Sequence, residues 1–289
     1  MPVDQLSVPL TKDQAYALVD AVMERDDLAL TASAHENEAT GEWFFSATCD
    51  SPPDLDSFVE LARQTLGGTV QFSVAPIDPE TNWVAKSLEG LPPVIAGGFY
   101  VYGSHEAGLI PAGLTAIKID AAQAFGTGHH ETTTGCLEAI DILLQQRTPR
   151  VMIDVGTGTG VLAIALAKRL HTPVIASDID PISVQTTIDN AAENAVAEWI
   201  VPVEATGVDH PIITQSAPYD LVVANILAGP LTALAPAMGC IANSGATIIL
   251  SGILDRQAPG VISAYAEAGM VLTQQLQRKE WTTLMLEKR

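Results

Sequence analysis

The stretch Val151-Met152-Ile153-Asp154-Val155-Gly156-Thr157-Gly158-Thr159-Gly160 decides the fold of this chain. Its first five residues are mostly apolar, which is typical of a short buried strand. Glycines then recur at alternate positions, and residues 161–170 are rich in good helix formers. A strand, a glycine turn and a helix in that order begin a nucleotide-binding βαβ unit. Glycine lets the backbone turn tightly there and lets a ligand come close.

An acidic residue ends the next predicted strand. Residues 173–177 form that strand, and Asp178 follows it, 22 residues after Gly156. This distance is close to the roughly 20 residues expected for a carboxylate that binds ribose hydroxyls. Val161 stands where a dinucleotide-binding turn has its third glycine, which suits a pyrophosphate poorly. The pattern therefore favours S-adenosylmethionine, which has a ribose and no phosphate, over NAD or a turn without a ligand.

The bulk composition limits the classes of protein. The chain has 289 residues, of which 47% are hydrophobic, so one large domain or two ordinary ones fit. We find no apolar run of the ~20 residues that cross a membrane and no secretory signal. The three cysteines are widely spaced, which indicates reduced thiols in a cytoplasmic protein. The net charge of -20 argues against direct nucleic-acid binding and permits a basic partner.

The N-terminal part predicts a small, separate domain. Residues 1–77 alternate as βαββαβ, which indicates a ferredoxin-like α+β domain. Its helices are expected over 11–25 and 55–66, and its strands over 6–10, 28–35, 42–49 and 69–74. Residues 1–90 contain 16 acidic and four basic residues, so this part is strongly negative. Capture of a basic macromolecule and a merely solvated acidic surface both remain open. A linker over 78–95 and a domain over 96–289 follow.

The remaining chain predicts an open α/β sheet with polar residues at its strand ends. Ligands of such sheets bind beyond the carboxyl ends of the strands. Gly156, Asp178 and Asn225 would each lie at such an end, so we expect them to converge. The amide oxygen of Asn225 suits an amine nucleophile, because it can accept a hydrogen and aim the lone pair at a methyl carbon. A simple turn asparagine is the alternative. Further strands are expected over 199–203, 219–224, 247–250, 271–276 and 282–286, and further helices over 181–194, 230–241 and 255–268.

A second motif, Ala124-Phe125-Gly126-Thr127-Gly128-His129-His130-Glu131-Thr132-Thr133-Thr134, precedes a helix predicted over 136–144. Its glycines free the backbone, and either Thr132 or Thr133 is suited to cap the helix. A helical zinc site needs a second histidine four positions after the first, but position 134 is threonine. We therefore expect no metal, and a capping or substrate-lining role for the histidines.

In combination, these motifs resemble the bacterial methyltransferases of large-subunit ribosomal protein eleven. The resemblance also uses Asp178-Ile179-Asp180-Pro181, the run from Asn225 to Pro230, and Ser251-Gly252-Ile253-Leu254. It covers most of residues 78–289, whereas residues 1–77 match in size and layout. It implies a seven-stranded class I, Rossmann-like methyltransferase domain and an N-terminal substrate-recognition domain. It also implies a protein-lysine N-methyltransferase that moves methyl groups from S-adenosylmethionine to lysine ε-amines and the N-terminal α-amine.

The resemblance assigns roles to individual residues. Asn225 and His130 would position the reacting groups beside the loop from Phe125 to His130. Thr157 and Thr159 stand where relatives often carry cysteine and serine, which are also small and polar. We expect a cytoplasmic monomer, bound to no membrane and to no nucleic acid directly, with a basic ribosomal protein of the large-subunit stalk base as partner. The residues expected to contact the cofactor are Phe125, Gly128, Thr133, Gly156, Gly158, Asp178 and Asn225.

Three rival functions share parts of this pattern. A methyltransferase of another protein or of a small amine would use every one of the cofactor residues. A dinucleotide oxidoreductase would bind NAD, but the glycine spacing opposes it. A ribosome-associated binding module without catalysis would bind the cofactor without turnover.

Overall fold

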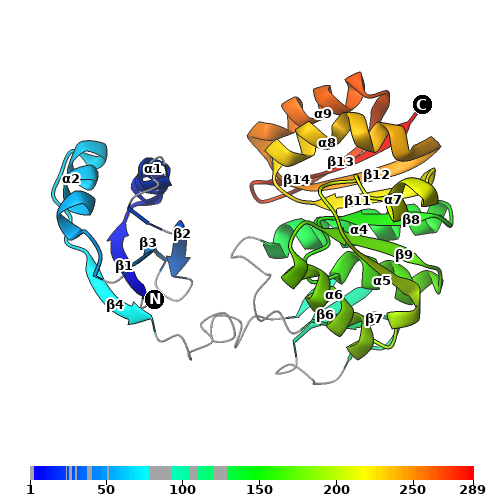
Figure 1. The fold of residues 1–289 in the computed structure, drawn as a ribbon, viewed down its shortest axis with the longest axis horizontal. Helices are drawn as coiled ribbons and strands as arrows, with labels where there is room; N and C mark the ends of the chain where they lie inside the picture. The colour runs from blue at the N-terminus through cyan, green and yellow to red at the C-terminus, as the bar shows by residue number, and fades with distance from the viewer. Residues whose placement is uncertain are drawn as a thin grey trace. The chain divides into compact units, whose positions relative to one another are not determined.

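The computed structural model of the chain describes residues 3–23, 25, 28–29, 31–37, 41–50, 52–77, 93–103, 110–119 and 129–289. The chain divides into two compact units, Met1–Trp83 and Val84–Arg289, each with its own sheet and core (Figure 1). Most of the predicted linker, residues 78–92, lies outside the described residues. None of the helices in the described part of the chain is both long and apolar enough to cross a membrane.

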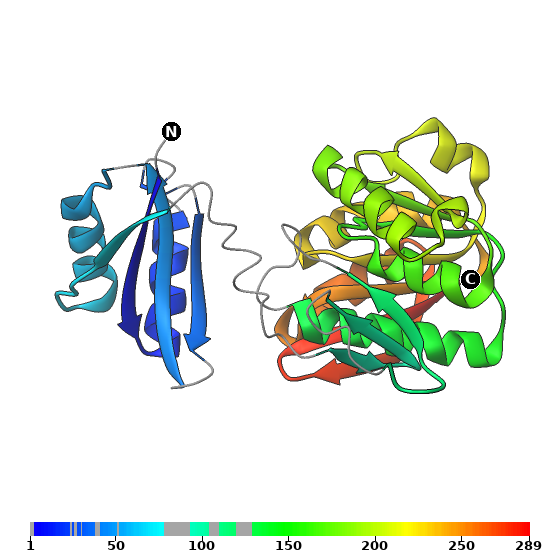
Figure 2. The ribbon, with the colours of Figure 1, turned by 90° about the horizontal axis from the view of Figure 1, so that it is seen from below.

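The first unit has the ferredoxin-like arrangement that the sequence predicts. Its sheet has the strand order β2-β3-β1-β4 with antiparallel neighbours, and both helices pack on one core (Figure 1, Figure 2). Leu18 of the first helix and Phe58 of the second meet Phe45 of the central strand in this core. The elements are β1 Val3–Leu10, α1 Lys12–Met23, β2 Thr31–Asn37, β3 Glu42–Asp50, α2 Leu55–Leu66 and β4 Ser73–Ile77.

Local signals explain where α2 begins and ends. Asp54 caps its start, because the Asp54 carboxylate accepts hydrogen bonds from the backbone N–H and the hydroxyl of Ser57. Gly67 ends it with a φ of 72°. The last strand differs from its predicted span of 69–74 and begins only at Ser73. Val70 and Phe72 precede it as partly buried core residues, so their apolar pattern reflects packing and not strand pairing.

The second unit is built on a seven-stranded sheet with the order β10-β9-β8-β11-β12-β14-β13. All neighbouring strands are parallel except β14, which is antiparallel to both neighbours. The predicted seven-stranded Rossmann-like fold is therefore confirmed. Its strands are β8 Met152–Val155, β9 Val174–Asp178, β10 Ile200–Glu204, β11 Tyr219–Asn225, β12 Ala242–Leu254, β13 Met270–Arg278 and β14 Trp281–Lys288.

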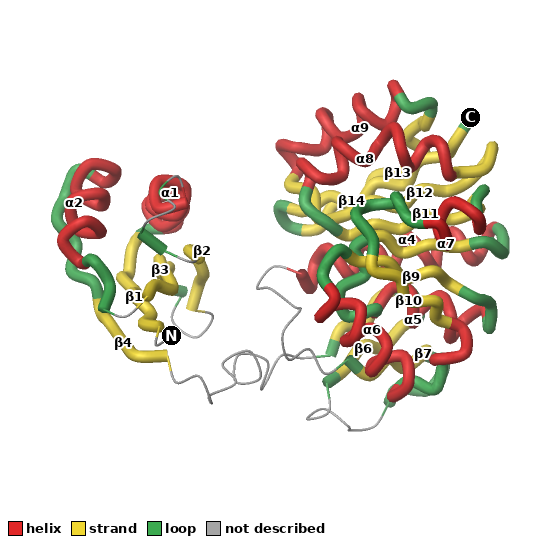
Figure 3. The backbone as a smooth tube through the Cα atoms, in the orientation of Figure 1, coloured by secondary structure: helices red, strands yellow, loops and turns green. Residues whose placement is uncertain are grey.

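Helices cover both faces of this sheet (Figure 3). α4, α5 and α6 share one core cluster with the sheet, and α7, α8 and α9 share the other. A small sheet, β5-β6-β7, packs against α4 and α5. The bounds are α4 His129–Gln146, α5 Val161–Leu170, α6 Pro181–Glu193, α7 Pro211–Ser216, α8 Ala228–Ile241, α9 Ala258–Glu267, β5 Val94–Ala96, β6 Phe99–Tyr102 and β7 Thr115–Lys118.

Several elements differ from the sequence prediction. α4 begins at His129, seven residues before the predicted helix. Thr132 and Thr133, which the sequence suggested as caps, therefore lie inside α4 and not at its start. The sequence did not predict β5 or α7, which have only three and six residues and leave no periodic pattern. Residues 94 and 95, assigned to the end of the linker, belong to β5. β12 extends far beyond residues 247–250 because its ends pair with β11 and β14.

Two glycines enclose Ile226, the residue that follows β11. Gly156 has a φ of +70°, and a Cβ atom there would lie 2.3 Å from Cγ2 of Ile226. Gly252 has a φ of +83°, and a Cβ atom there would lie 2.3 Å from the carbonyl oxygen of Ile226. The lack of side chains at both positions lets the β8–α5 turn and β12 approach the end of β11 closely.

Replacing Gly252 by alanine tests this close approach. We expect Gly252→Ala to lower the free energy of unfolding by more than about 2 kcal/mol, because it adds a backbone clash to the strain of a positive φ. Gly245→Ala is the matched control, since its φ is +75° and a Cβ atom there would meet nothing within 4 Å. It should lose only about 1–2 kcal/mol. Equal losses in urea unfolding would contradict the close approach.

Candidate cofactor and active site

The glycine turn after β8 is tied to the end of β9. The backbone N–H groups of Gly156 and Thr157 both donate to the carbonyl oxygen of Ser177, at 2.8 and 2.9 Å. Gly156 and Gly160 are required by packing, because a Cβ atom at Gly160 would lie 2.9 Å from Cγ2 of Thr187. A Cβ atom at Gly158 would meet nothing within 4 Å. Of these three glycines, Gly158 is therefore the one that faces open space at the edge of the sheet.

Asp178 ends β9 beside this turn. Its Oδ2 atom accepts a hydrogen bond of 2.8 Å from the backbone N–H of Gly158, and its Oδ1 atom accepts one from Asp180. The structure thus brings together two residues that the sequence predicted at one site. Each carboxylate oxygen can accept more than one hydrogen bond, so Asp178 keeps the capacity to bind hydroxyl donors.

Asn225 ends β11 at the same edge. In the register of the sheet, Ala224 lies beside Val155 of β8, and Asn225 lies beside Ser251 of β12. The Nδ2 atom of Asn225 donates a long hydrogen bond of 3.5 Å to Oγ1 of Thr133, in α4. The Oδ1 atom of Asn225 is buried, and no described residue donates to it. A buried acceptor without a donor costs about 1–3 kcal/mol, so it marks a place where a ligand can supply the hydrogen.

Hydrogen bonds join the first turn of α4 to the strands β12 and β14. The hydroxyl of Ser251 donates to the carbonyl oxygen of Thr132 at 3.2 Å and lies 2.8 Å from Oγ1 of Thr283. Gly135 allows this contact, because a Cβ atom there would lie 2.2 Å from the Thr283 hydroxyl. None of these contacts was predicted from the sequence. The available signal was that Ser251 begins one of the motifs that carry the family resemblance.

Asp154 is a buried carboxylate beneath the glycine turn, with 1% of its surface exposed. Its Oδ2 atom accepts hydrogen bonds from the Thr157 hydroxyl at 2.7 Å and from the backbone N–H of Ala163 at 3.2 Å. No described residue donates to its Oδ1 atom, which is buried. Burial raises the pKa of Asp154 to about 7, although these two hydrogen bonds act to lower it. An acidic residue inside an apolar strand was the sequence signal for this group.

A thiol of α4 is buried close to Asp154. Cys136 of α4 is fully buried, and burial is the main cause that raises the pKa of its thiol. The charge of Asp154 raises that pKa further, whereas a hydrogen bond with Ser251 lowers it. The thiol therefore stays neutral at physiological pH.

Some predicted site residues lie outside the part of the chain that the structure describes. Phe125 and Gly128 are among them, and so is the side chain of His130, whose backbone lies at the start of α4. Glu131, the next residue, pairs with Lys279 at 2.7 Å. In the described residues, no three His, Cys, Asp or Glu side chains gather as a metal site requires.

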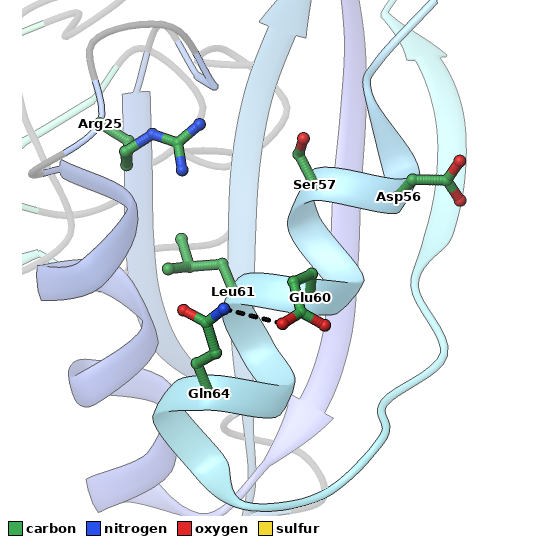
Figure 4. A pocket seen from close by; sticks show the side chains of 6 residues that line it. All are labelled: Arg25, Asp56, Ser57, Glu60, Leu61 and Gln64. Carbon is green, nitrogen blue, oxygen red and sulfur yellow. Dashed lines mark hydrogen bonds between the residues drawn. The ribbon is translucent and has the colours of Figure 1, made fainter.

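The first unit has an open pocket of about 270 Å³ (Figure 4). Its Glu60 carboxylate accepts hydrogen bonds from Arg63 and Gln64, which lower the pKa of Glu60 to about 2. Glu60 is therefore a charged surface group. The pocket belongs to the first unit and shares no residue with the strand ends described above. The residues that line it are Arg25, Asp56, Ser57, Glu60, Leu61 and Gln64.

Comparison with known proteins supports one family. The profile described as ribosomal protein L11 methyltransferase (PrmA) matches residues 9–289. A ribosomal protein L11 methyltransferase of Chelativorans sp. is 40% identical over 277 residues, or 95% of this chain and 94% of that protein. One from Brucella suis is 50% identical over 209 residues, or 72% and 73% of the two chains.

A solved structure agrees with these sequence matches. The crystal structure of a ribosomal protein L11 methylase from Lactobacillus delbrueckii subsp. bulgaricus matches with a TM-score of 0.61 and 28% identity. The match covers 69% of this chain and 100% of the chain in that crystal structure. The shared sheet, the strand-end residues and the matches over nearly the whole length lead to one assignment. This chain belongs to the ribosomal protein L11 methyltransferase family.

Proposed function

We propose that this protein transfers methyl groups from S-adenosylmethionine to lysine ε-amines and to the N-terminal α-amine of ribosomal protein L11. The observation that carries the proposal is the buried Oδ1 atom of Asn225, an acceptor that lacks a donor among the described residues. It lies at the edge where Gly158 and Asp178 meet. The family and its relatives, which are named as methyltransferases of this protein, support the choice of substrate.

The residues at this edge fit S-adenosylmethionine, the methyl donor. Asp178 can accept hydrogen bonds from a ribose, and Gly158 leaves room beside it. Asp154 and Asn225 each add a buried Oδ1 atom to which no described residue donates a hydrogen bond. None of these four residues is cationic, so none of their side chains would attract a phosphate group. The bound cofactor supplies a methyl group already activated by its positively charged sulfur, so the protein needs chiefly to position the reactants.

Asn225 orients the attacking amine. Its Oδ1 atom accepts an N–H hydrogen from the amine, which directs the nitrogen lone pair toward the methyl carbon. Thr133 accepts from the Nδ2 atom of Asn225 and so fixes which way the amide faces. The lysine loses its proton to water before it reaches this position, since only the neutral amine is a nucleophile. His130, Phe125 and Gly128 belong to the proposed reaction loop.

The first unit captures the substrate. Residues 1–90 contain 16 acidic and four basic residues, and a basic ribosomal protein is complementary to that charge. Asp13 and Asp20 of α1 and Asp56 of α2 are exposed, so they are available to an approaching protein. The enzyme acts as a cytoplasmic monomer on this protein of the stalk base, and it makes no direct contact with nucleic acid.

Replacing Asp178 tests the ribose contact. We expect Asp178→Ala to weaken cofactor binding by about 1–3 kcal/mol, because a hydrogen bond to a charged group is lost. Isothermal titration calorimetry measures this change. Asp189→Ala, which alters an exposed carboxylate on α6, should leave the affinity unchanged. Equal affinities for wild type and Asp178→Ala would rule out the ribose assignment.

Replacing Asn225 tests the positioning of the amine. We expect Asn225→Ala to lower kcat by about 10²-fold, because the nucleophile is no longer aimed. Transfer of labelled methyl groups to purified ribosomal proteins measures the rate, and mass spectrometry identifies the methylated amines. Asn243→Ala, at an exposed position of β12, serves as control. A rate like that of the wild type, or methyl groups on other proteins only, would refute the proposal.

Neutralising charges on the first unit tests substrate capture. The triple variant Asp13→Asn, Asp20→Asn, Asp56→Asn should raise KM for ribosomal protein L11 several-fold, with kcat unchanged, because it weakens electrostatic attraction. The control neutralises three exposed acids of the second unit: Asp189→Asn, Glu198→Gln and Glu204→Gln. Steady-state kinetics at low and high salt separate the two variants. Similar KM values in both would favour a merely solvated acidic surface.

A further inference from the structure

Asp154 is buried in a way that favours its neutral form. Its side chain is almost fully enclosed, and its Oδ1 atom has no hydrogen-bond donor among the described residues. Removing an ionised carboxylate from water is costly unless its oxygens are paired. Burial accordingly raises the pKa of Asp154 to about 7. Burial and the unpaired oxygen therefore favour the protonated form of this group in the ligand-free protein.

Among the described groups that shift the pKa of Asp154, none is a cation, and only the hydrogen bonds from Thr157 and Ala163 favour its ionised form. Asp178 of β9 disfavours ionisation of Asp154, and Cys136 of α4 is a neutral thiol. The first turn of α5 contributes the Ala163 N–H, and the adjacent strand β11 contributes Val223 as register partner, which is not ionisable. The cations of α5 are in its last turn, at Lys168 and Arg169. None of these described neighbours brings a positive charge to Asp154, whereas a cationic ligand would.

We propose that Asp154 holds a proton in the ligand-free protein and releases it to solvent when the cationic cofactor occupies the edge. Asp154 would thereby discriminate between S-adenosylmethionine, whose sulfur is positively charged, and the demethylated product, whose sulfur is neutral. This inference rests on the proposed binding of the cofactor at Gly158 and Asp178. It concerns how the same site tells its methyl donor from its product.

The sign of the pH dependence follows from that exchange. Below pH 7 the neutral form of Asp154 prevails, so binding of the cation must expel a proton and the affinity falls by up to about tenfold per pH unit. Above pH 7 the carboxylate is already ionised, and this dependence disappears. The affinity for cofactor relative to product should thus rise between pH 6 and pH 8. Methyl transfer removes the cation, Asp154 takes up a proton again, and the product binds less tightly.

Calorimetry on the full chain tests the exchange directly. Titrations of S-adenosylmethionine and of the demethylated product at pH 7, in phosphate and in Tris buffer, report how many protons are released. Wild type should release about half a proton more with the cofactor than with the product. Asp154→Asn keeps an oxygen acceptor for Thr157 and Ala163 but cannot ionise, so its proton release should be the same for both ligands. Asp189→Asn, the surface control, should behave as wild type.

The outcomes distinguish this inference from the proposed binding site. Equal proton release in wild type and Asp154→Asn, with binding heat preserved, would overturn the role of Asp154 alone. Absence of any binding heat in the wild type would overturn the placement of the cofactor as well. Both ligands also carry an ionisable α-amino group, and the comparison of wild type with Asp154→Asn for the same ligand cancels its contribution.

Carbon-13 NMR of aspartate carboxyl groups gives a test that needs no variant to fold. In the ligand-free wild type, one carboxyl resonance should titrate with a midpoint near pH 7. In the cofactor complex the same resonance should stay that of an ionised carboxylate down to pH 6. Titration of every aspartate below pH 5 in the ligand-free protein would overturn the inference.

Discussion

The contact of Ile226 with two glycines is the constraint on which the site depends. Gly156 lies in the turn after β8 and Gly252 lies in β12, and neither leaves room for a side chain against Ile226. Their approach brings the ends of β8, β11 and β12 to one place, with Asn225 immediately before Ile226. The glycines of the motif therefore have two purposes. Gly156 makes room for Ile226, whereas Gly158 faces open space where we propose that the cofactor binds, and the sequence alone does not separate these purposes.

The site is a region where hydrogen-bond acceptors exceed donors. Asp178 has two backbone donors, but Asp154 and Asn225 each keep one buried oxygen without a described partner. Such atoms oppose folding, and the packed sheet and helices around them offset that cost. A ligand that brings ammonium, hydroxyl or amine hydrogens removes the imbalance.

Sequence predicted the parts of this structure that depend on local signals. The bounds of α2 and α5 were right, because caps and glycines mark them, and the strand-end rule predicted that Asp178 lies close to the turn that begins at Gly156. Contacts between segments that are far apart in the sequence could not be predicted. Ser251 is hydrogen-bonded to Thr132, which is 119 positions away in the sequence, and neither segment contains a pattern that predicts the other as its partner. The proposed roles of Phe125, Gly128 and His130 stay predictions, since these groups lie outside the described residues.

The burial of Cys136 has a consequence for an enzyme that handles an alkylating reagent. A methyl donor reactive enough to modify an amine also threatens any thiolate nearby, and thiolates are the stronger nucleophiles. Enclosure in the core and the neighbouring carboxylate keep this sulfur protonated, and therefore inert. The packing that builds this edge of the sheet therefore also keeps the Cys136 thiol unreactive.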